Sequence, residues 1–100
     1  MISLITPSKA QQKLAEHVRQ RRLAMELTQA GLAERAGVPL PTLRKFEQQG
    51  VLSLAAFLKL HMVLGGLDDI IRATAPAPKP FASIDEVLAV RTTRKRGVRK

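Results

Sequence analysis

Apolar residues between Thr28 and Glu47 recur at the spacing of two short helices joined by a tight turn. Leu32 and Ala36 share one helical face at i, i+4, and the hydroxyl of Thr28 can cap that helix. Gly37 follows where a chain leaving a helix takes a left-handed conformation, which glycine adopts without steric cost. The pattern therefore predicts a helix that begins after Thr28 and ends at Gly37.

A second short helix is predicted from Pro41 to Gly50. Proline suits a first helical position, where its missing N–H would be unpaired, and it pushes Leu40 out of the α region. Leu43 and Phe46 face inward at i, i+3. The side chains expected to face outward are Thr42, Arg44 and Lys45. A short helix with a cationic outer face after a glycine turn has the form of a helix-turn-helix.

Another helix is predicted before this pair. It begins either at Thr6-Pro7, with threonine as cap, or at a capping box of Ser8 and Gln11, and it continues to Leu27. The residues expected to face inward are Leu14, Val18 and Leu23. The cations near its end form either a solvated face or a set of phosphate contacts, and these are Arg19, Arg21 and Arg22.

Two more helices are predicted after the pair. Ser53 caps a strongly apolar helix that ends at Gly65-Gly66, and residues 67–73 form a short fifth helix. The residues that share one face of the apolar helix are Leu54, Phe57, Leu58, His61 and Leu64. Five helices with short links predict an all-α domain over residues 1–73.

Residues 74–80 are rich in proline and predict a semi-rigid linker. Beyond it, Ser83 and Glu86 form a capping box for a short amphipathic helix, and a basic tail continues to residue 100. The apolar side chains of this helix, expected to bind a partner, are Phe81, Ile84, Val87 and Leu88. A helix this short is unstable alone in water, so it should dock on another protein or fold back on its own domain. The tail could instead follow DNA phosphates.

The length, composition and charge of the chain limit its size, its fold class and the kind of partner it can have. One hundred residues, 45% apolar with 3% aromatic, suit a single small domain of packed helices. The absence of cysteine fits a reducing cytoplasm, and no apolar run is long enough to span a bilayer. Net charge is +9, and residues 91–100 carry six cations and no acid, which leaves +3 for residues 1–90. This balance points to a polyanion: DNA, RNA or a membrane surface.

The sequence contains no recognisable catalytic set. His17 and His61 lie in separate predicted helices, and no carboxylate stands at metal-ligand spacing from either. A histidine on the apolar face of a helix, such as His61, is typically a half-buried residue whose hydrogen bonds are satisfied. We therefore expect a protein that is not an enzyme and that needs neither a metal nor another cofactor.

The order and spacing of residues 28–47 are similar to the lambda-repressor/Cro-like (Xre) helix-turn-helix family. The matching positions are Thr28-Gln29, Leu32-Ala33, Ala36-Gly37-Val38, Thr42-Leu43 and Phe46-Glu47. The resemblance covers about residues 10–72 and implies a five-helix domain that binds double-stranded DNA. It has two departures: Gly31 lies inside a helix, and Leu40-Pro41 replaces residues that in many relatives are polar and hydrogen-bond base edges.

The resemblance also implies which residues meet DNA. Gln29 stands where family members touch a phosphate, although it could be an ordinary exposed glutamine. Arg44 and Lys45 can address guanine O6 and N7, or contact phosphates only. Leu40 could meet a thymine methyl group, and Thr42 a base or a phosphate. The predicted DNA-binding residues are therefore Gln29, Leu40, Pro41, Thr42, Arg44 and Lys45.

We expect a dimeric, sequence-specific repressor that binds a palindromic operator. The layout of a helix-turn-helix domain with a short arm and a basic end resembles HipB-type antitoxins, which neutralise a HipA-type kinase toxin and repress their shared operon. One alternative is a stand-alone regulator without a protein partner. Another is an RNA- or ribosome-binding module, against which the scarcity of base-stacking aromatic residues counts.

Overall fold

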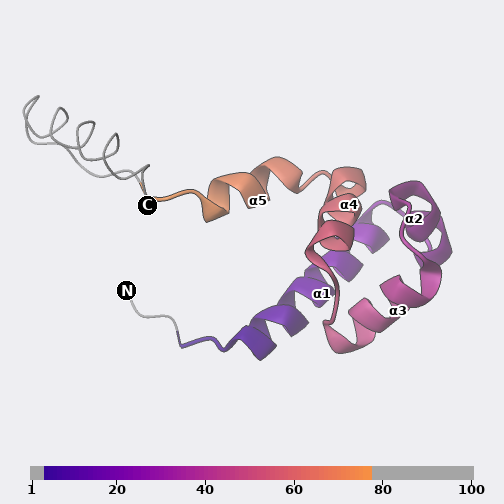
Figure 1. Cartoon of the computed structure of the whole chain (residues 1–100). Coiled ribbons are helices and arrows are strands. Elements are labelled where there is room, and N and C mark those ends of the chain that lie inside the picture. The colour runs from indigo at the N-terminus through magenta and orange to yellow at the C-terminus, as the bar shows by residue number, and fades with distance from the viewer. Residues whose placement is uncertain (1–3, 78–100) are drawn as a thin grey trace, which may run out of the picture.

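A computed structural model describes residues 4–77, and within that range the chain forms helices and no strand (Figure 1). The five helices are α1 (Pro7–Ala24), α2 (Gln29–Ala36), α3 (Leu40–Gln49), α4 (Leu54–Leu64) and α5 (Leu67–Thr74). The predicted all-α, five-helix domain is confirmed. Of the predicted linker, residues 74–77 are described, and Thr74 is the last residue of α5; residues 78–80, the short helix and the basic tail lie outside the described residues.

Side-chain hydroxyls mark the beginnings of three helices, as predicted. The backbone N–H of Lys9 donates to Thr6 Oγ1 at 3.2 Å, and the N–H of Gly31 donates to Thr28 Oγ1 at 2.9 Å. Ser53 caps α4 in the same way. Each hydroxyl satisfies one of the N–H groups that a first helical turn leaves unpaired. Of the two predicted starts for α1, the structure has the one at Thr6-Pro7.

The predicted end of α1 at Leu27 is wrong, because the helix ends at Ala24. The chain then turns through Glu26, which takes a left-handed conformation at φ 56°. Leu27 is thereby turned into the core, where it is buried. Tertiary packing of Leu27 therefore overrides the helical tendency of this stretch.

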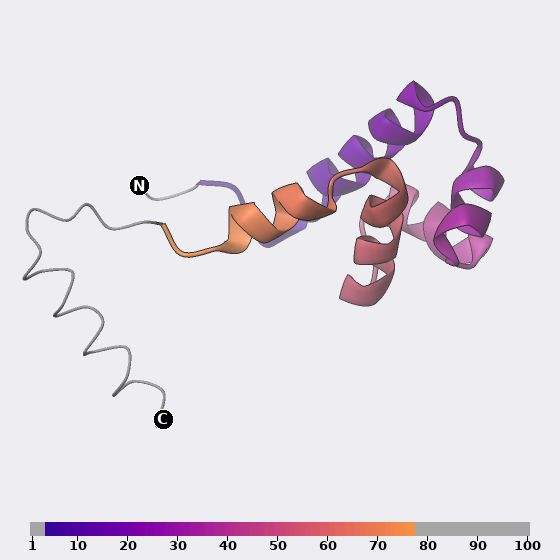
Figure 2. The same ribbon diagram turned by 90° about the horizontal axis from the view of Figure 1, so that it is seen from above.

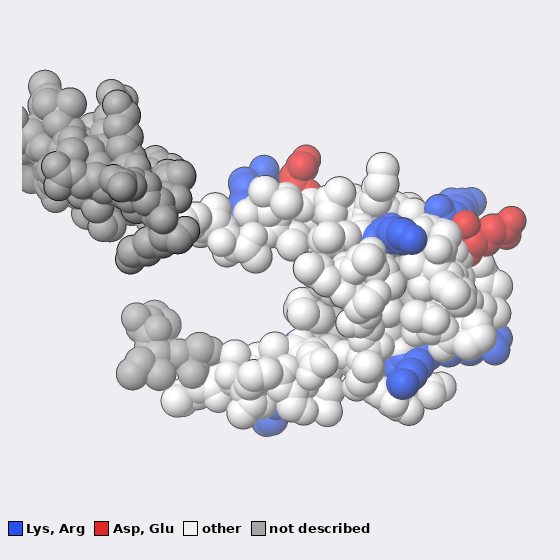
Figure 3. All heavy atoms as spheres, viewed as in Figure 1, with Lys and Arg blue, Asp and Glu red and all other residues white. Residues whose placement is uncertain are grey.

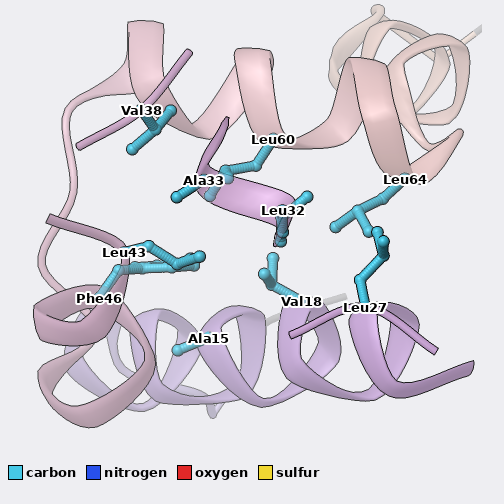
Figure 4. Packing of buried hydrophobic residues seen from close by; sticks show 10 residues of the cluster. All are labelled: Ala15, Val18, Leu27, Leu32, Ala33, Val38, Leu43, Phe46, Leu60 and Leu64. Carbon is cyan, nitrogen blue, oxygen red and sulfur yellow. The ribbon is translucent and has the colours of Figure 1, made fainter. Parts of the chain in front are cut away.

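The core lies where α1, α3 and α4 surround α2 (Figure 4). Leu32 and Ala33 of α2 project between α1 on one side and α4 on the other. The buried apolar residues are Ala15, Val18, Leu27, Leu32, Ala33, Val38, Leu43, Phe46, Leu60 and Leu64. Every helix of the predicted helix-turn-helix therefore has one side fixed by the core.

Leu14 and Leu23, predicted to face inward, and Leu54, predicted to share the apolar face of α4, are exposed. Leu14 and Leu23 of α1 keep 43% and 49% of their surface accessible, and Leu54 at the start of α4 keeps 70%. The side of α1 that meets the core carries Ala15, Val18 and Arg22. The small side chain of Ala15 lets α1 approach its neighbours closely. The adjacent face of α1, which includes Leu14, is therefore left at the edge of the core.

The two ends of the domain differ. Figures 1 and 2 show α2 and α3 at one end, whereas α5 and the beginning of α1 extend to the other. No residue of α5 is buried; Leu67 and Ile70 are half-buried, and Ile71 is 63% exposed. Among residues 4–77, no helix is both long and apolar enough to cross a membrane.

Candidate nucleic-acid interface

Helix α3 has a buried side and an exposed side, as the sequence predicts. Leu43 and Phe46 are buried, and the ring of Phe46 meets that of Phe57 edge to face, with centroids 6.1 Å apart. Arg44 and Lys45 are exposed on the opposite side. The core thus fixes the rotation of α3 about its axis and directs its two cations to solvent.

Helix α3 begins one residue earlier than predicted. Leu40 is its first residue and Pro41 its second, while Pro39 takes the cap position without a side-chain hydrogen bond. Helix boundaries commonly differ by a residue in this way. Leu40 packs partly against the core and Thr42 is half-buried, whereas Pro41 is exposed. Only part of the Leu40 side chain is therefore open to a base.

The turn between α2 and α3 is short and well anchored. Gly37 takes the predicted left-handed conformation, with φ 69° and ψ 34°. The N–H of Val38 then donates to the carbonyl of Ala33 at 3.0 Å, and the Val38 side chain is buried between the helices. These contacts fix the angle at which α3 leaves α2, which decides how α3 would meet a DNA groove.

A buried ion pair joins α1 to α3. Arg22 Nε donates to Glu47 Oε2 and Arg22 Nη2 donates to Glu47 Oε1, both at 2.9 Å. The third contact is from Arg22 Nη1 to the carbonyl of Leu27, also at 2.9 Å. The two side chains are only 9% and 4% exposed. This bidentate geometry is the strong form of an arginine–carboxylate ion pair.

Gln29 joins the same cluster from α2. Its Nε2 donates to Glu47 Oε1 at 3.2 Å, and the residue is half-buried. Gln29 is the first residue of α2, so the hydrogen bond ties the beginning of α2 to the end of α3. It is therefore not an ordinary exposed glutamine. We call Arg22, Gln29 and Glu47 the buried polar cluster.

Both predicted surroundings of Arg22 are wrong, because its guanidinium is neither solvated nor free to bind a phosphate. The available signal was its spacing: Ala15, Val18 and Arg22 follow one another at i, i+3 and i+7 on the core side of α1. Arg19 and Arg21 do lie at the surface. Arg19 approaches Glu16 at 3.8 Å, and Arg21 reaches the carbonyl of Leu64 at 3.5 Å.

Charges on the face seen in Figure 3 are scattered. In that view, the lysine and arginine side chains are separated from one another by uncharged residues. Residues 4–77 bring together no group of three side chains suited to hold a metal ion. His61 is buried, and its Nδ1 lies 2.9 Å from the carbonyl of Phe57, as expected for a histidine with a satisfied hydrogen bond.

A comparison with protein families identifies the domain. A family model described as Helix-turn-helix matches residues 18–71, more than half of the chain, from the second half of α1 into α5. The comparison with curated proteins found no match. The matched stretch contains the capped α2, the left-handed turn at Gly37 and the two-sided α3. The chain therefore belongs to the lambda-repressor/Xre-like helix-turn-helix family of DNA-binding transcription regulators.

Proposed function

We propose that the protein is a dimeric repressor that reads a palindromic operator with the exposed side of α3. The observation that carries this proposal is the position of Arg44 and Lys45. Both are exposed on a helix whose opposite side is buried and whose end is fixed by the buried polar cluster. A cationic side chain held at a defined angle can reach base edges in the major groove.

The other predicted DNA contacts have distinct roles in this proposal. Gln29 meets a phosphate, for which its hydrogen bond to Glu47 orients the amide in advance. Pro41 and the open part of Leu40 offer apolar surface to a thymine methyl group, and Thr42 offers a hydroxyl. Specificity would then come from α3, and affinity from both helices and the basic tail.

Dimerisation follows from the small size of α3. The helix has ten residues, and a single helix of this length contacts few base pairs. Two copies on half-sites about 34 Å apart would double the contacts and match a palindromic operator. Such a protein acts by binding rather than by catalysis.

We further propose that it is the antitoxin of a HipA-type toxin–antitoxin operon, acts in the cytoplasm and represses its own operon. The support is the layout alone: a helix-turn-helix domain followed by a proline-rich linker, a predicted amphipathic helix and a basic end. The partner-binding side chains would be Phe81, Ile84, Val87 and Leu88, which lie outside the described residues. A stand-alone regulator would have the same domain without a protein partner.

An RNA- or ribosome-binding role receives less support. Single-stranded RNA is commonly read by aromatic rings on which bases stack. The chain has three phenylalanines and no tyrosine or tryptophan. Phe46 is buried, and Phe57 is half-buried against Phe46 and His61, so neither presents an open stacking surface.

The test is a binding assay with the DNA upstream of the gene. The proposal expects binding to that DNA in preference to random DNA at the same salt concentration, and a supershift when the neighbouring gene product is added. Preference for the upstream DNA without any effect of the neighbouring protein would support the stand-alone regulator. Equal affinity for upstream and random DNA would contradict sequence-specific repression.

A further inference from the structure

An apolar groove runs along α1, between that helix and parts of α3, α4 and α5. It consists of two adjoining hollows, of about 260 and 220 Å³, that share Leu14 and Phe57 in their lining. Leu54 lines the first hollow, and Ile70 of α5 lines the second. Figure 3, in the view of Figure 1, shows the molecule hollowed between α5 and the beginning of α1. The first hollow also reaches Phe46 and Gly50 at the end of α3, whereas the second is bordered by α5, which lies at the opposite end of the domain from α2 and α3 (Figures 1 and 2).

Helix α5, one wall of this groove, is poorly covered by the rest of the domain. It has eight residues, none of them buried, and helices of this length are unstable in water without tertiary packing. Ile70, which lines the groove from α5, is only half-buried, and Leu14 across the groove is 43% exposed. Additional apolar cover at this place would stabilise α5 and remove these side chains from water.

We propose that residues 81–89 of the same chain dock in this groove. Their apolar side chains recur on one face of a helix, which suits an apolar groove: Phe81, Ile84, Val87 and Leu88. Asp85 borders that face, where it can meet His17 and Arg21 in the groove lining. Asp69, the acid in that lining, is already paired with Arg72.

The tether favours this occupant over a second copy of the chain. Six residues, 75–80, join α5 to Phe81, and a proline-rich stretch of that length spans about 19 Å. Residues 75–77 continue away from the domain beyond α5 (Figures 1 and 2), so the return to Leu14 and Phe57 falls to residues 78–80 and to the segment itself, which as a helix of nine residues would be about 13 Å long. A tethered segment has a local concentration on the order of millimolar, far above that of a second copy at micromolar protein.

If a protein partner exists, residues 81–89 have two alternative positions, one docked in the groove and one bound to the partner. The same four apolar side chains cannot cover the groove and contact a partner at once. A partner would therefore bind by displacing residues 81–89, and α5 would lose its cover at that moment. The docking itself does not depend on any partner or on DNA.

Disulfide trapping in the full chain tests the proposal, because the chain contains no cysteine. The groove pair is His17→Cys with Leu88→Cys, and the control pair is Gln48→Cys with Leu88→Cys; His17 and Gln48 are both exposed, and Gln48 lies on α3. At low micromolar protein, the groove pair should close a disulfide within one chain, on the order of ten times faster than the control pair. Equal rates for the two pairs, or a disulfide formed only between chains, would overturn the proposal.

A pair of full-length variants tests the apolar contact separately. Ile84→Asp places a charge on the apolar face of the segment, whereas Ala82→Asp places the same charge off that face. Only Ile84→Asp should shift the backbone amide signals of Leu14 and Ala73 in ¹⁵N spectra. Unchanged signals in both variants, or equal shifts in both, would refute docking. Neither experiment includes DNA or a partner, so its failure leaves the repressor proposal intact.

Discussion

At the scale of single residues, the guanidinium of Arg22 occupies a position on α1 where an apolar side chain would ordinarily complete a core. Its charge is matched by three oxygens, two from Glu47 and one from Leu27. A buried ion pair need not stabilise a fold more than apolar residues of the same shape would. Breaking it by removing one partner is costly, because the remaining charge stays buried and unpaired.

We therefore expect Glu47→Ala to lower the free energy of unfolding by about 3–5 kcal/mol. The control is Glu34→Ala, an exposed carboxylate on α2 that should change stability by less than about 0.5 kcal/mol. Urea denaturation followed by circular dichroism measures both. A double variant, Arg22→Met with Glu47→Leu, should recover much of the loss, and its failure to do so would contradict the explanation by an unpaired charge.

The exposed cations of α3 should act on specificity rather than stability. Replacing Arg44 or Lys45 with Ala should weaken operator binding by about 1–3 kcal/mol for each base contact that the substitution removes, and it should relax the preference at particular positions. Gln29→Ala should weaken operator and random DNA nearly equally, because a phosphate carries no sequence information. Lys59→Ala, a cation on α4, is the control. Uniform losses for the Arg44 and Lys45 variants would identify them as phosphate contacts.

The orientation of Arg44 and Lys45 could be predicted because it follows from local spacing around Leu43 and Phe46. The surroundings of Arg22 and Gln29 could not, because both depend on Glu47, which lies 25 residues after Arg22 and 18 after Gln29. Pairings over such separations are fixed by how helices pack. Whether any of the six predicted residues contacts DNA stays a prediction.

At the scale of elements, two glycines end the helices of the motif in different surroundings. Gly37 has φ 69° and open space where a Cβ would be. Gly50, with φ 75°, lies against α1, where an added Cβ would come within 3.1 Å of the backbone of Gln11. Both positions disfavour other residues because of their backbone conformation, but only at Gly50 would a side chain also push two helices apart.

Gly37→Ala should therefore destabilise the domain by about 1–2 kcal/mol, the cost of a left-handed alanine. Gly50→Ala should destabilise it more, because α1 must also shift, and it should lower DNA affinity by moving α3. Thermal unfolding of the two variants side by side measures the difference. Equal melting temperatures would show that the contact with Gln11 relaxes without strain.

Helix beginnings could be predicted because Thr6, Thr28 and Ser53 act within a single turn. The end of α1 could not, because it depends on the burial of Leu27 in a core built from several helices. The same limit applies to Leu54, which periodicity places with Phe57 and Leu58 although the packing leaves it exposed. Short-range chemistry thus decided where α1, α2 and α4 begin, and packing decided which faces the helices bury.

At the scale of the whole molecule, the proposed dimer must present two α3 helices at a fixed separation. Sedimentation at micromolar concentration should give the mass of a dimer, free or on DNA carrying two half-sites about 34 Å apart. Inserting five base pairs between the half-sites should abolish tight binding, because it turns the second half-site to the far side of the duplex. A monomer under both conditions would contradict the dimer.

The division of α3 into a buried and an exposed side also bears on how such a regulator can diversify. Leu43 and Phe46 are committed to the core, and Glu47 to the buried polar cluster, whereas Pro41, Arg44 and Lys45 contact little of the domain. Substitutions at the exposed positions can therefore accumulate with little loss of folding. A duplicated copy of this gene could therefore acquire a new operator through a few surface substitutions. It would then control different genes from the original regulator while keeping the same folded domain.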